Sequence, residues 1–381
     1  MLAFKTGNFS QDKYGPAQTF RRNQAHLKLQ VRNFVLGGAI VITLFFLLQS
    51  FNVGPHEIHR TTRSSLQATS KLRPGAWRSH GPRVKKVTSL FGQENELYEA
   101  AVRSHEEHDD MHGYEMEVLR EKIVDSHWSK PTYLLSLLVT EMAKPVEERT
   151  DWLMWFGPDV ILLNPQIPLE TFLPPDDFIN THFLGTHDQE GINCGVFFLR
   201  VHEWSVRMMI EVLIVLKSHI DVKENPESQV QKALQTVITS DQFRRHVNYQ
   251  PRTWYNAYQL GMDEFEGEPG NLLVHFHDLG GDKWSAMANT IDQKSEWRGR
   301  LSVPLKQTTY EMETREYWER IRKAWHLLNL AQSRPFVPAA DDSFRRLQYA
   351  VTYEMDRSEV LMTAMTNLQD ALELQDSERV V

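Results

Sequence analysis

Short apolar runs alternate with segments of helical periodicity through the middle of the chain. Runs rich in β-branched and aromatic residues predict strands, and the longer segments between them predict helices. This alternation favours an α/β domain with a mainly parallel sheet over residues 86–306. The predicted strands lie at residues 87–91, 116–119, 152–156, 160–163, 178–180, 196–199 and 272–276, and the predicted helices at 97–111, 132–142, 204–217 and 227–239.

The pattern changes after residue 306, where strand-like runs cease. Residues 311–331 and 342–374 have long helical periodicity with mixed charge, and Pro335 and Pro338 separate them. We therefore expect a helical extension over residues 307–381 that acts as a lid, a brace or a contact for a partner.

A separate apolar run occupies residues 34–51, eighteen positions without a charged side chain. This length approaches the ~20 residues that cross a bilayer, and basic residues outnumber acidic ones in the segment before it. The bias predicts a cytosolic tail at 1–33, a single-pass type II signal anchor at 34–51 and a polar stem at 52–85. A buried core helix is the alternative interpretation of the run.

Composition narrows the functional classes. The 381 residues include 42 Lys and Arg against 50 Asp and Glu, a net charge of −8. This acidic balance argues against a general nucleic-acid binder, which needs a concentrated basic surface. The single cysteine, Cys194, excludes an intrachain disulfide and a cysteine-rich metal site. Its place beside the apolar run 196–199, with no basic partner in evidence, predicts a small buried side chain rather than a nucleophile.

Polar residues next to apolar strands are the candidates for chemistry, because ligands bind beyond the carboxyl ends of strands in open α/β sheets. Asp159 follows the 152–156 run and suits a divalent metal, with a turn-forming Asp after Pro as the alternative. His275 lies at the end of a strand, and it is either a metal ligand or a hydrogen-bonded histidine of the core. Asn193 and Gly195 precede another strand, where an amide and a close backbone approach suit a sugar.

Two further clusters have weaker patterns. Trp254 and Asn256 lie in an aromatic run that suits either stacking on a sugar or base or burial in the core. The histidine-rich run at 105–112 lacks the spacing of a His-Glu-x-x-His site, and its charge pattern favours the solvated end of a helix.

Taken in order, several segments resemble the galactosyl- and α-1,6-mannosyltransferase family of the fungal secretory pathway, glycosyltransferase family 34. The similarity covers about residues 86–306 and depends on the fixed order of the segments at 151–156, 164–165, 191–200, 204–205, 254–258 and 273–276. The resemblance implies a GT-A-like nucleotide-sugar transferase domain. It also implies a type II protein of the Golgi membrane whose catalytic domain is lumenal.

The resemblance assigns metal ligands residue by residue. Asp159 matches the second acid of the family's Asp-x-Asp, and His275 matches the histidine of its His-Phe-x-Gly. Both are therefore expected to bind Mn²⁺ or another divalent metal together with the donor diphosphate. The chain departs from the family at Gly157, which replaces the first acid, and at Asp278, which replaces the glycine.

Donor-binding and catalytic residues are implied in the same way. The family's Asn-x-Gly near the donor sugar matches Asn193 and Gly195, and the matching aromatic segment adds Trp254 and Asn256 to the expected donor site. The family's Asp-Gln-Ser, at the reacting face, corresponds best to residues 228–230, in which Gln229 is retained and the aspartate is lost, although Glu227 stands next to the segment.

These assignments imply transfer of mannose or galactose from GDP-mannose or UDP-galactose to a glycan acceptor. The alternative is a catalytically inactive paralogue that binds glycans or assembles with other glycosyltransferase subunits in the same membrane. If Asp159 and His275 hold one metal, their side chains should lie within about 5–6 Å of each other.

Overall fold

The computed structural model describes residues 81–380 apart from 93, 125, 220–224, 297, 336, 376 and 378. The expected cytosolic tail, signal anchor and most of the stem lie outside the described residues. Within the described part of the chain, none of the helices combines the length and the apolar character that a membrane span requires. Residues 81–381 form one compact unit.

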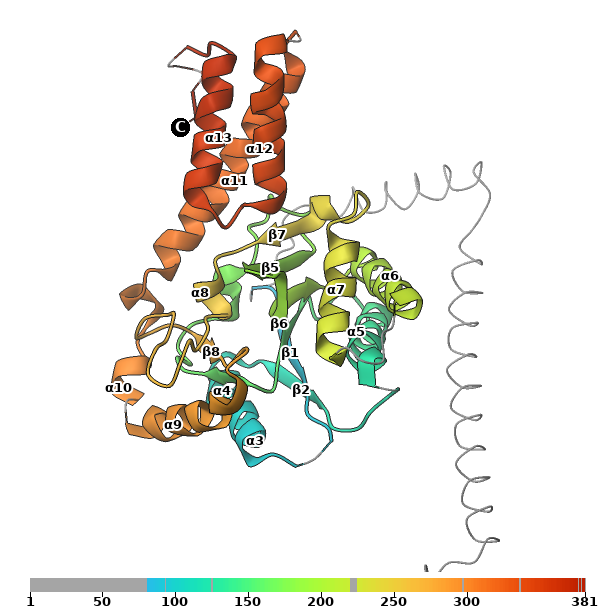
Figure 1. Cartoon of the computed structure of the whole chain (residues 1–381), viewed down its shortest axis with the longest axis vertical. Helices are drawn as coiled ribbons and strands as arrows, with labels where there is room; N and C mark the ends of the chain where they lie inside the picture. Colours follow the sequence, from blue (N-terminus) through green and yellow to red (C-terminus); the bar gives the residue numbers. More distant parts are fainter. Residues whose placement is uncertain are drawn as a thin grey trace, which may run out of the picture. The chain divides into compact units, whose positions relative to one another are not determined.

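A six-stranded sheet lies at the centre of this unit (Figure 1). Its neighbours pair in parallel except at β6, which is antiparallel to both strands beside it. Five strands therefore point the same way, which confirms the predicted mainly parallel sheet. The strand order is β2 (Glu115–Leu119), β1 (Val84–Ser89), β3 (Trp152–Phe156), β6 (Gly191–Arg200), β5 (Phe183–Asp188) and β7 (Val247–Tyr249).

A two-stranded sheet extends this scaffold beyond the end of β3. Strand β4 (Val160–Leu162) pairs antiparallel with β8 (Leu273–His275), and Val160 lies opposite His275. The chain thus turns directly from the fully buried strand β3 through Gly157 and Pro158 into β4. This turn brings the end of β3 beside the end of β8.

Helices cover both faces of the central sheet. Alternate side chains of β3 point to opposite sides, so that Leu153 and Trp155 join one apolar cluster and Trp152, Met154 and Phe156 join another. The first cluster is completed by three mutually packed helices, which are seen on one side of the sheet in Figure 1: α5 (Ser126–Ala143), α6 (Glu203–His219) and α7 (Pro226–Ile238).

Shorter helices surround the β4–β8 pair. They are α3 (Glu96–Arg103), α4 (Glu106–His112), α8 (Arg252–Tyr255), α9 (Lys283–Glu296) and α10 (Arg298–Leu301). The helix predicted over 97–111 is therefore two helices. The break lies at Ser104, whose Oγ donates to the Ala101 carbonyl and accepts from the Leu162 amide at 2.8 Å. These two hydrogen bonds connect β4 with the C-terminal end of α3.

Two histidines of the 105–112 run, His105 before α4 and His108 within it, are buried, which corrects the expected solvated helix end at these two positions. His105 stacks on Phe156 with ring centroids 4.1 Å apart, and His108 bonds the Ile167 carbonyl. Lys86 is also fully buried and contacts Asp109 at 2.5 Å. Burial lowers the pKa of Lys86 to about 8, while the Asp109 carboxylate opposes this effect. The charged residues of this run therefore include the partner of the buried Lys86 as well as solvent-exposed side chains.

The C-terminal extension forms three helices that lie side by side in Figure 1: α11 (Tyr310–Ser333), α12 (Asp341–Tyr353) and α13 (Ser358–Ala371). Its apolar side chains belong to the same cluster as one face of the sheet. The buried Tyr317 hydroxyl donates to the Tyr249 carbonyl on β7 at 2.7 Å. The extension is therefore part of the folded core.

Two other predicted elements also differ from the structure. Residues 178–180 form turns, in which the Phe178 amide bonds the Pro175 carbonyl and Ile179 is exposed, and the strand lies further on at β5. The helix predicted over 342–374 is divided between α12 and α13. At the break, the buried Met355 places its sulfur 3.1 Å from Asn248 Nδ2, so a tertiary contact interrupts the periodic pattern.

Candidate active site

Asp159 and His275 face each other at the ends of β3 and β8. His275 Nε2 lies 3.6 Å from Asp159 Oδ1, well inside the separation expected for ligands of one metal. Their side chains are only 16% and 4% exposed. Antiparallel pairing of β4 with β8 fixes this relationship, because Val160, the residue after Asp159, is the partner of His275.

A chain of hydrogen bonds determines which nitrogen of His275 faces Asp159. The Gly195 amide donates to Asn193 Oδ1 at 2.8 Å, and Asn256 Nδ2 donates to the same oxygen at 3.0 Å. Asn256 Oδ1 is then an acceptor, so His275 Nδ1, 2.8 Å away, must be the donor. Nε2 is consequently the ring nitrogen that faces Asp159 and is available to ligate a cation held between the two side chains, as in a metal-ligating histidine.

Gly195 is required by the close approach of the imidazole. A Cβ at this position would lie 2.2 Å from His275 Cε1 and 2.8 Å from Asn193 Oδ1. Both neighbours are buried and hydrogen-bonded. Gly195 therefore leaves room for the imidazole of His275. Asn193 Oδ1 accepts from both the Gly195 amide and Asn256, which connects the predicted Asn-x-Gly pair with Asn256.

Lys283, the first residue of α9, contacts the other oxygen of Asp159. Its Nζ donates to Asp159 Oδ2 at 2.6 Å. Burial alone would raise the pKa of Asp159, but the charges and hydrogen bonds of His275 and Lys283 outweigh it and hold that pKa well below its usual range. Asp159 is thus an anion whose two oxygens are oriented by two different partners.

The Asp159 and His275 pair fits a divalent cation as two of its ligands. A separation of 3.6 Å suits ligands that are each about 2.0–2.2 Å from one cation. Among the described residues, no group of three or more His, Cys, Asp or Glu side chains is placed to hold a metal. Such a cation would therefore take its remaining ligands from donor phosphates and water, as Mg²⁺ commonly does in phosphate sites.

The two predicted catalytic residues lie on the first turns of α7. Glu227 is exposed and Gln229 is buried. Burial lowers the pKa of the nearby Lys130, while Cys194, Glu227 and Asp159 act in the opposite direction. Lys130 Nζ also donates to the Cys194 carbonyl at 2.6 Å. Roles of Glu227 and Gln229 in catalysis stay predictions.

Two sequence predictions concern side chains that the structure places in the core. Trp254 is 2% exposed and donates to Glu313 on α11 at 2.7 Å, so its indole has no open face for a donor. This corrects its assignment to the donor site and favours the alternative of a core aromatic. Cys194 is buried as expected, and burial raises the pKa of its thiol to about 11.

Two residues around the site, Lys283 and Asp188, were missed by the sequence patterns. Lys283 follows a glycine-rich turn and carries no periodic signal. Asp188, at the end of β5, accepts from Asn193 Nδ2 at 3.1 Å and from the Tyr258 hydroxyl at 2.8 Å. Strand β5 was not predicted from the sequence. Tyr258 lies within the aromatic run for which the sequence predicted either stacking on a ligand or burial in the core. Only the tertiary fold brings these side chains together.

Residues 175–280 match the galactosyl transferase GMA12/MNN10 family. The match includes every predicted site residue except Asp159, which precedes it. This match confirms the resemblance inferred from the order of the motifs.

A curated relative and several solved structures are similar to the chain. It is 23% identical over 215 residues to an alpha-1,2-galactosyltransferase of Schizosaccharomyces pombe, a match that covers 47% of this chain and 55% of the relative. The chain thus spans about half the length of the curated relative it matches. Two similar structures are a glycosyltransferase involved in glycosylation of the major capsid of PBCV-1 (TM-score 0.40, 16% identity, 56% of this chain and 100% of that chain) and the galactosyltransferase LgtC in complex with donor and acceptor sugar analogs (TM-score 0.35, 12% identity, 57% and 100%).

Proposed function

We propose that the protein is a glycosyltransferase of GT-A-like fold that moves a hexose, mannose or galactose, from a nucleotide sugar to a glycan acceptor. The observation that carries this proposal is the 3.6 Å approach of His275 Nε2 to Asp159 Oδ1. The hydrogen bond from His275 to Asn256 gives that nitrogen the tautomer of a ligand. The match of residues 175–280 to a galactosyl transferase family supports the same conclusion.

The donor diphosphate is the part of the substrate that these side chains suit. Asp159 and His275 would hold Mn²⁺ or a similar divalent cation, which when bound neutralises the charge that develops on the leaving diphosphate. Lys283 supplies a second positive charge on the other side of Asp159. Asn193 and Gly195 keep the imidazole in place, and Asn256 fixes its tautomer. Glu227 and Gln229 are proposed to act at the reacting face.

A second candidate is a catalytically inactive glycan-binding or complex-forming subunit, and Gly157 favours it. A Cβ at residue 157 would lie 2.5 Å from Asp159 Oδ1. The observed position of Asp159 therefore depends on the absence of the acid that the family places there. With one carboxylate fewer, the affinity for a cation falls, and the Asp159–Lys283 ion pair partly neutralises the remaining one.

We also propose that the protein is a single-pass type II protein of the Golgi membrane with its folded unit in the lumen. Support comes from the uncharged run at residues 34–51 and from the basic residues that precede it. Protease treatment of sealed microsomes tests this topology. A protected C-terminal epitope is expected, and its cleavage would place the folded unit on the cytosolic side.

Donor hydrolysis by the purified full-length chain distinguishes the two functions. With Mn²⁺ present, we expect slow release of nucleoside diphosphate from GDP-mannose or UDP-galactose. Asp159→Asn should reduce the rate about 100-fold or more, because it removes a charged contact to the diphosphate site. The matched control is Asp177→Asn, at an exposed aspartate that pairs with Arg322. Saturable donor binding without hydrolysis would favour the inactive subunit.

A further inference from the structure

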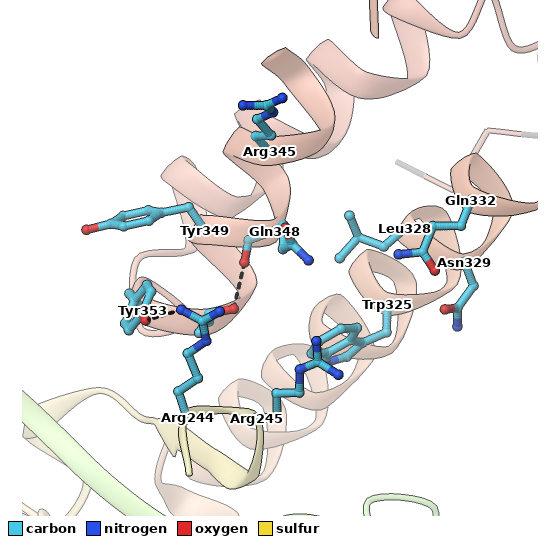
Figure 2. Close-up of a pocket in the computed structure, with 11 residues that line it drawn as sticks. Arg244, Arg245, Trp325, Leu328, Asn329, Gln332, Arg345, Gln348, Tyr349 and Tyr353 are labelled. Atoms are coloured by element: carbon cyan, nitrogen blue, oxygen red, sulfur yellow. Dashed lines mark hydrogen bonds between the residues drawn. The ribbon is translucent and has the colours of Figure 1, made fainter. Parts of the chain in front are cut away.

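A hollow of about 370 Å³ lies between α11, α12 and the short 3₁₀ turn at Arg244–His246. Figure 2 shows Gln348 of α12 extending toward Leu328 of α11, with Arg244 and Arg245 extending from the turn at the base of the hollow. Its volume falls within the range of roughly 300–1,000 Å³ that is usual for small-molecule sites.

This hollow is separate from the candidate active site. The 3₁₀ turn precedes β7, which is parallel to β5 and points the same way as β3. Asp159 follows the carboxyl end of β3, whereas the turn precedes the amino end of β7. The two places therefore lie at opposite ends of the strands, and one ligand of monosaccharide size cannot occupy both.

The lining carries three guanidinium groups and no carboxylate. Arg244 pairs with Asp241 at 2.8 Å, and Arg345 pairs with Asp341 at 2.8 Å, both through aspartates outside the lining. For Arg245, which is exposed, the described part of the chain shows neither an ion pair nor a hydrogen bond. A planar guanidinium with unused donors is suited to bidentate contact with a phosphate or carboxylate.

The remaining lining suits a sugar ring. Trp325 and Tyr349 supply aromatic faces, and Tyr349 is 53% exposed. Aromatic side chains of this kind combine apolar contact area with a polar edge. The amides of Asn329, Gln332 and Gln348 each offer donors and an acceptor, a combination that matches hydroxyl groups.

We propose that this groove is a second binding site, which takes an anionic saccharide: a hexose unit that carries a phosphate or similar charged group. The guanidinium groups contact the anion, while the aromatic faces and amides contact the ring and its hydroxyls. The site goes beyond the proposed transfer reaction, because it lies away from the donor diphosphate site and needs no metal.

Calorimetric titration of the full-length chain tests this inference with three probes: mannose 6-phosphate, mannose and inorganic phosphate. Mannose 6-phosphate should bind about tenfold more tightly than either of the other two, because it alone satisfies both parts of the lining. Arg245→Gln should weaken it about tenfold. Tyr349→Ala should reduce its affinity to that of phosphate. Lys323→Gln, at an exposed position of α11 outside the lining, is the control that removes one charge and should change nothing.

Donor hydrolysis should be unchanged in Arg245→Gln, so failure of this inference and failure of the proposed transferase activity are separable. Three results would overturn the inference. One is the absence of saturable mannose 6-phosphate binding, and another is an affinity equal to that of phosphate alone. The third is an affinity unaltered by Arg245→Gln. Tighter binding of poly-L-glutamate than of the sugar phosphate would assign the groove to an acidic peptide instead.

Discussion

The imidazole of His275 rests directly against Gly195, so closely that a Cβ at residue 195 would lie 2.2 Å from Cε1. Gly195→Ala must therefore displace either the imidazole or strand β6. We expect a loss of about 1–3 kcal/mol in the free energy of unfolding, as overpacked buried sites show. Donor turnover should also fall, because the orientation of Nε2 depends on this contact.

Denaturant unfolding and donor hydrolysis measure these two effects of Gly195→Ala. Gly261→Ala is the matched control, because a Cβ there meets nothing within 4 Å and the backbone is not left-handed. An alanine at 195 that leaves both stability and turnover unchanged would contradict the described packing.

Asp278 has a left-handed backbone conformation, with φ of 51°, at the position where the family has glycine. A side chain costs free energy in this region, although Asp tolerates it better than most residues. Asp278→Gly should therefore raise the free energy of unfolding by up to about 1 kcal/mol. Asp282→Gly is the control, because Asp282 has no positive φ, and it should not raise the free energy of unfolding. A lower denaturation midpoint for Asp278→Gly would refute this explanation.

Lys283 should affect donor binding through its contact with Asp159 at 2.6 Å. Lys283→Gln removes the only charge described on that oxygen, so we expect KM for the donor to rise about tenfold. Lys283→Arg retains the charge and should recover much of the loss. Steady-state kinetics with both variants measure the effect. A KM unchanged in Lys283→Gln would exclude the lysine from diphosphate binding.

Glu141 links the acid stability of the protein to a buried ion pair. Burial alone would raise its pKa, but hydrogen bonds from Lys144, Lys85 and the Thr150 amide outweigh it and lower the pKa to about 2. The pKa is therefore depressed on folding, so the stabilisation is complete above pH 4.5 and is lost as the pH falls toward 2.

Glu141→Gln should accordingly be less stable than the wild type near neutral pH. The difference in the free energy of unfolding should shrink between about pH 4.5 and 2. Glu148→Gln, at an exposed position, should leave the profile unchanged. Denaturant titrations across this pH range provide the comparison. A difference that stays constant with pH would show that Glu141 acts through packing alone.

Strong local patterns predicted the frame of the fold. The apolar run Trp152–Phe156 predicted a strand, which is fully buried, and the helix predicted over 227–239 is α7, which begins after its N-cap Asn225 with Pro226 in the first turn. The approach of Asp159 to His275 followed from family motifs at two strand ends. Their side chains are 3.6 Å apart, within the expected distance.

The remaining features depend on contacts that sequence spacing does not encode. Burial of His105 requires the ring of Phe156, more than fifty positions away in the sequence. Trp254 belongs to the core because Glu313 on α11 accepts from its indole. Lys283 reaches Asp159 only because β8 and the turn after it direct α9 back toward the end of β3. Each depends on tertiary structure.

Calorimetric titration of nucleotide sugars tests the central claim most directly. The full-length chain should bind either GDP-mannose or UDP-galactose saturably with Mn²⁺ present, and more weakly after chelation. His275→Gln should abolish the effect of Mn²⁺ on binding, whereas His246→Gln, at the other end of the strands, should retain it. Failure to bind either donor, or an effect of Mn²⁺ that survives His275→Gln, would contradict the assignment of Asp159 and His275 as the diphosphate site.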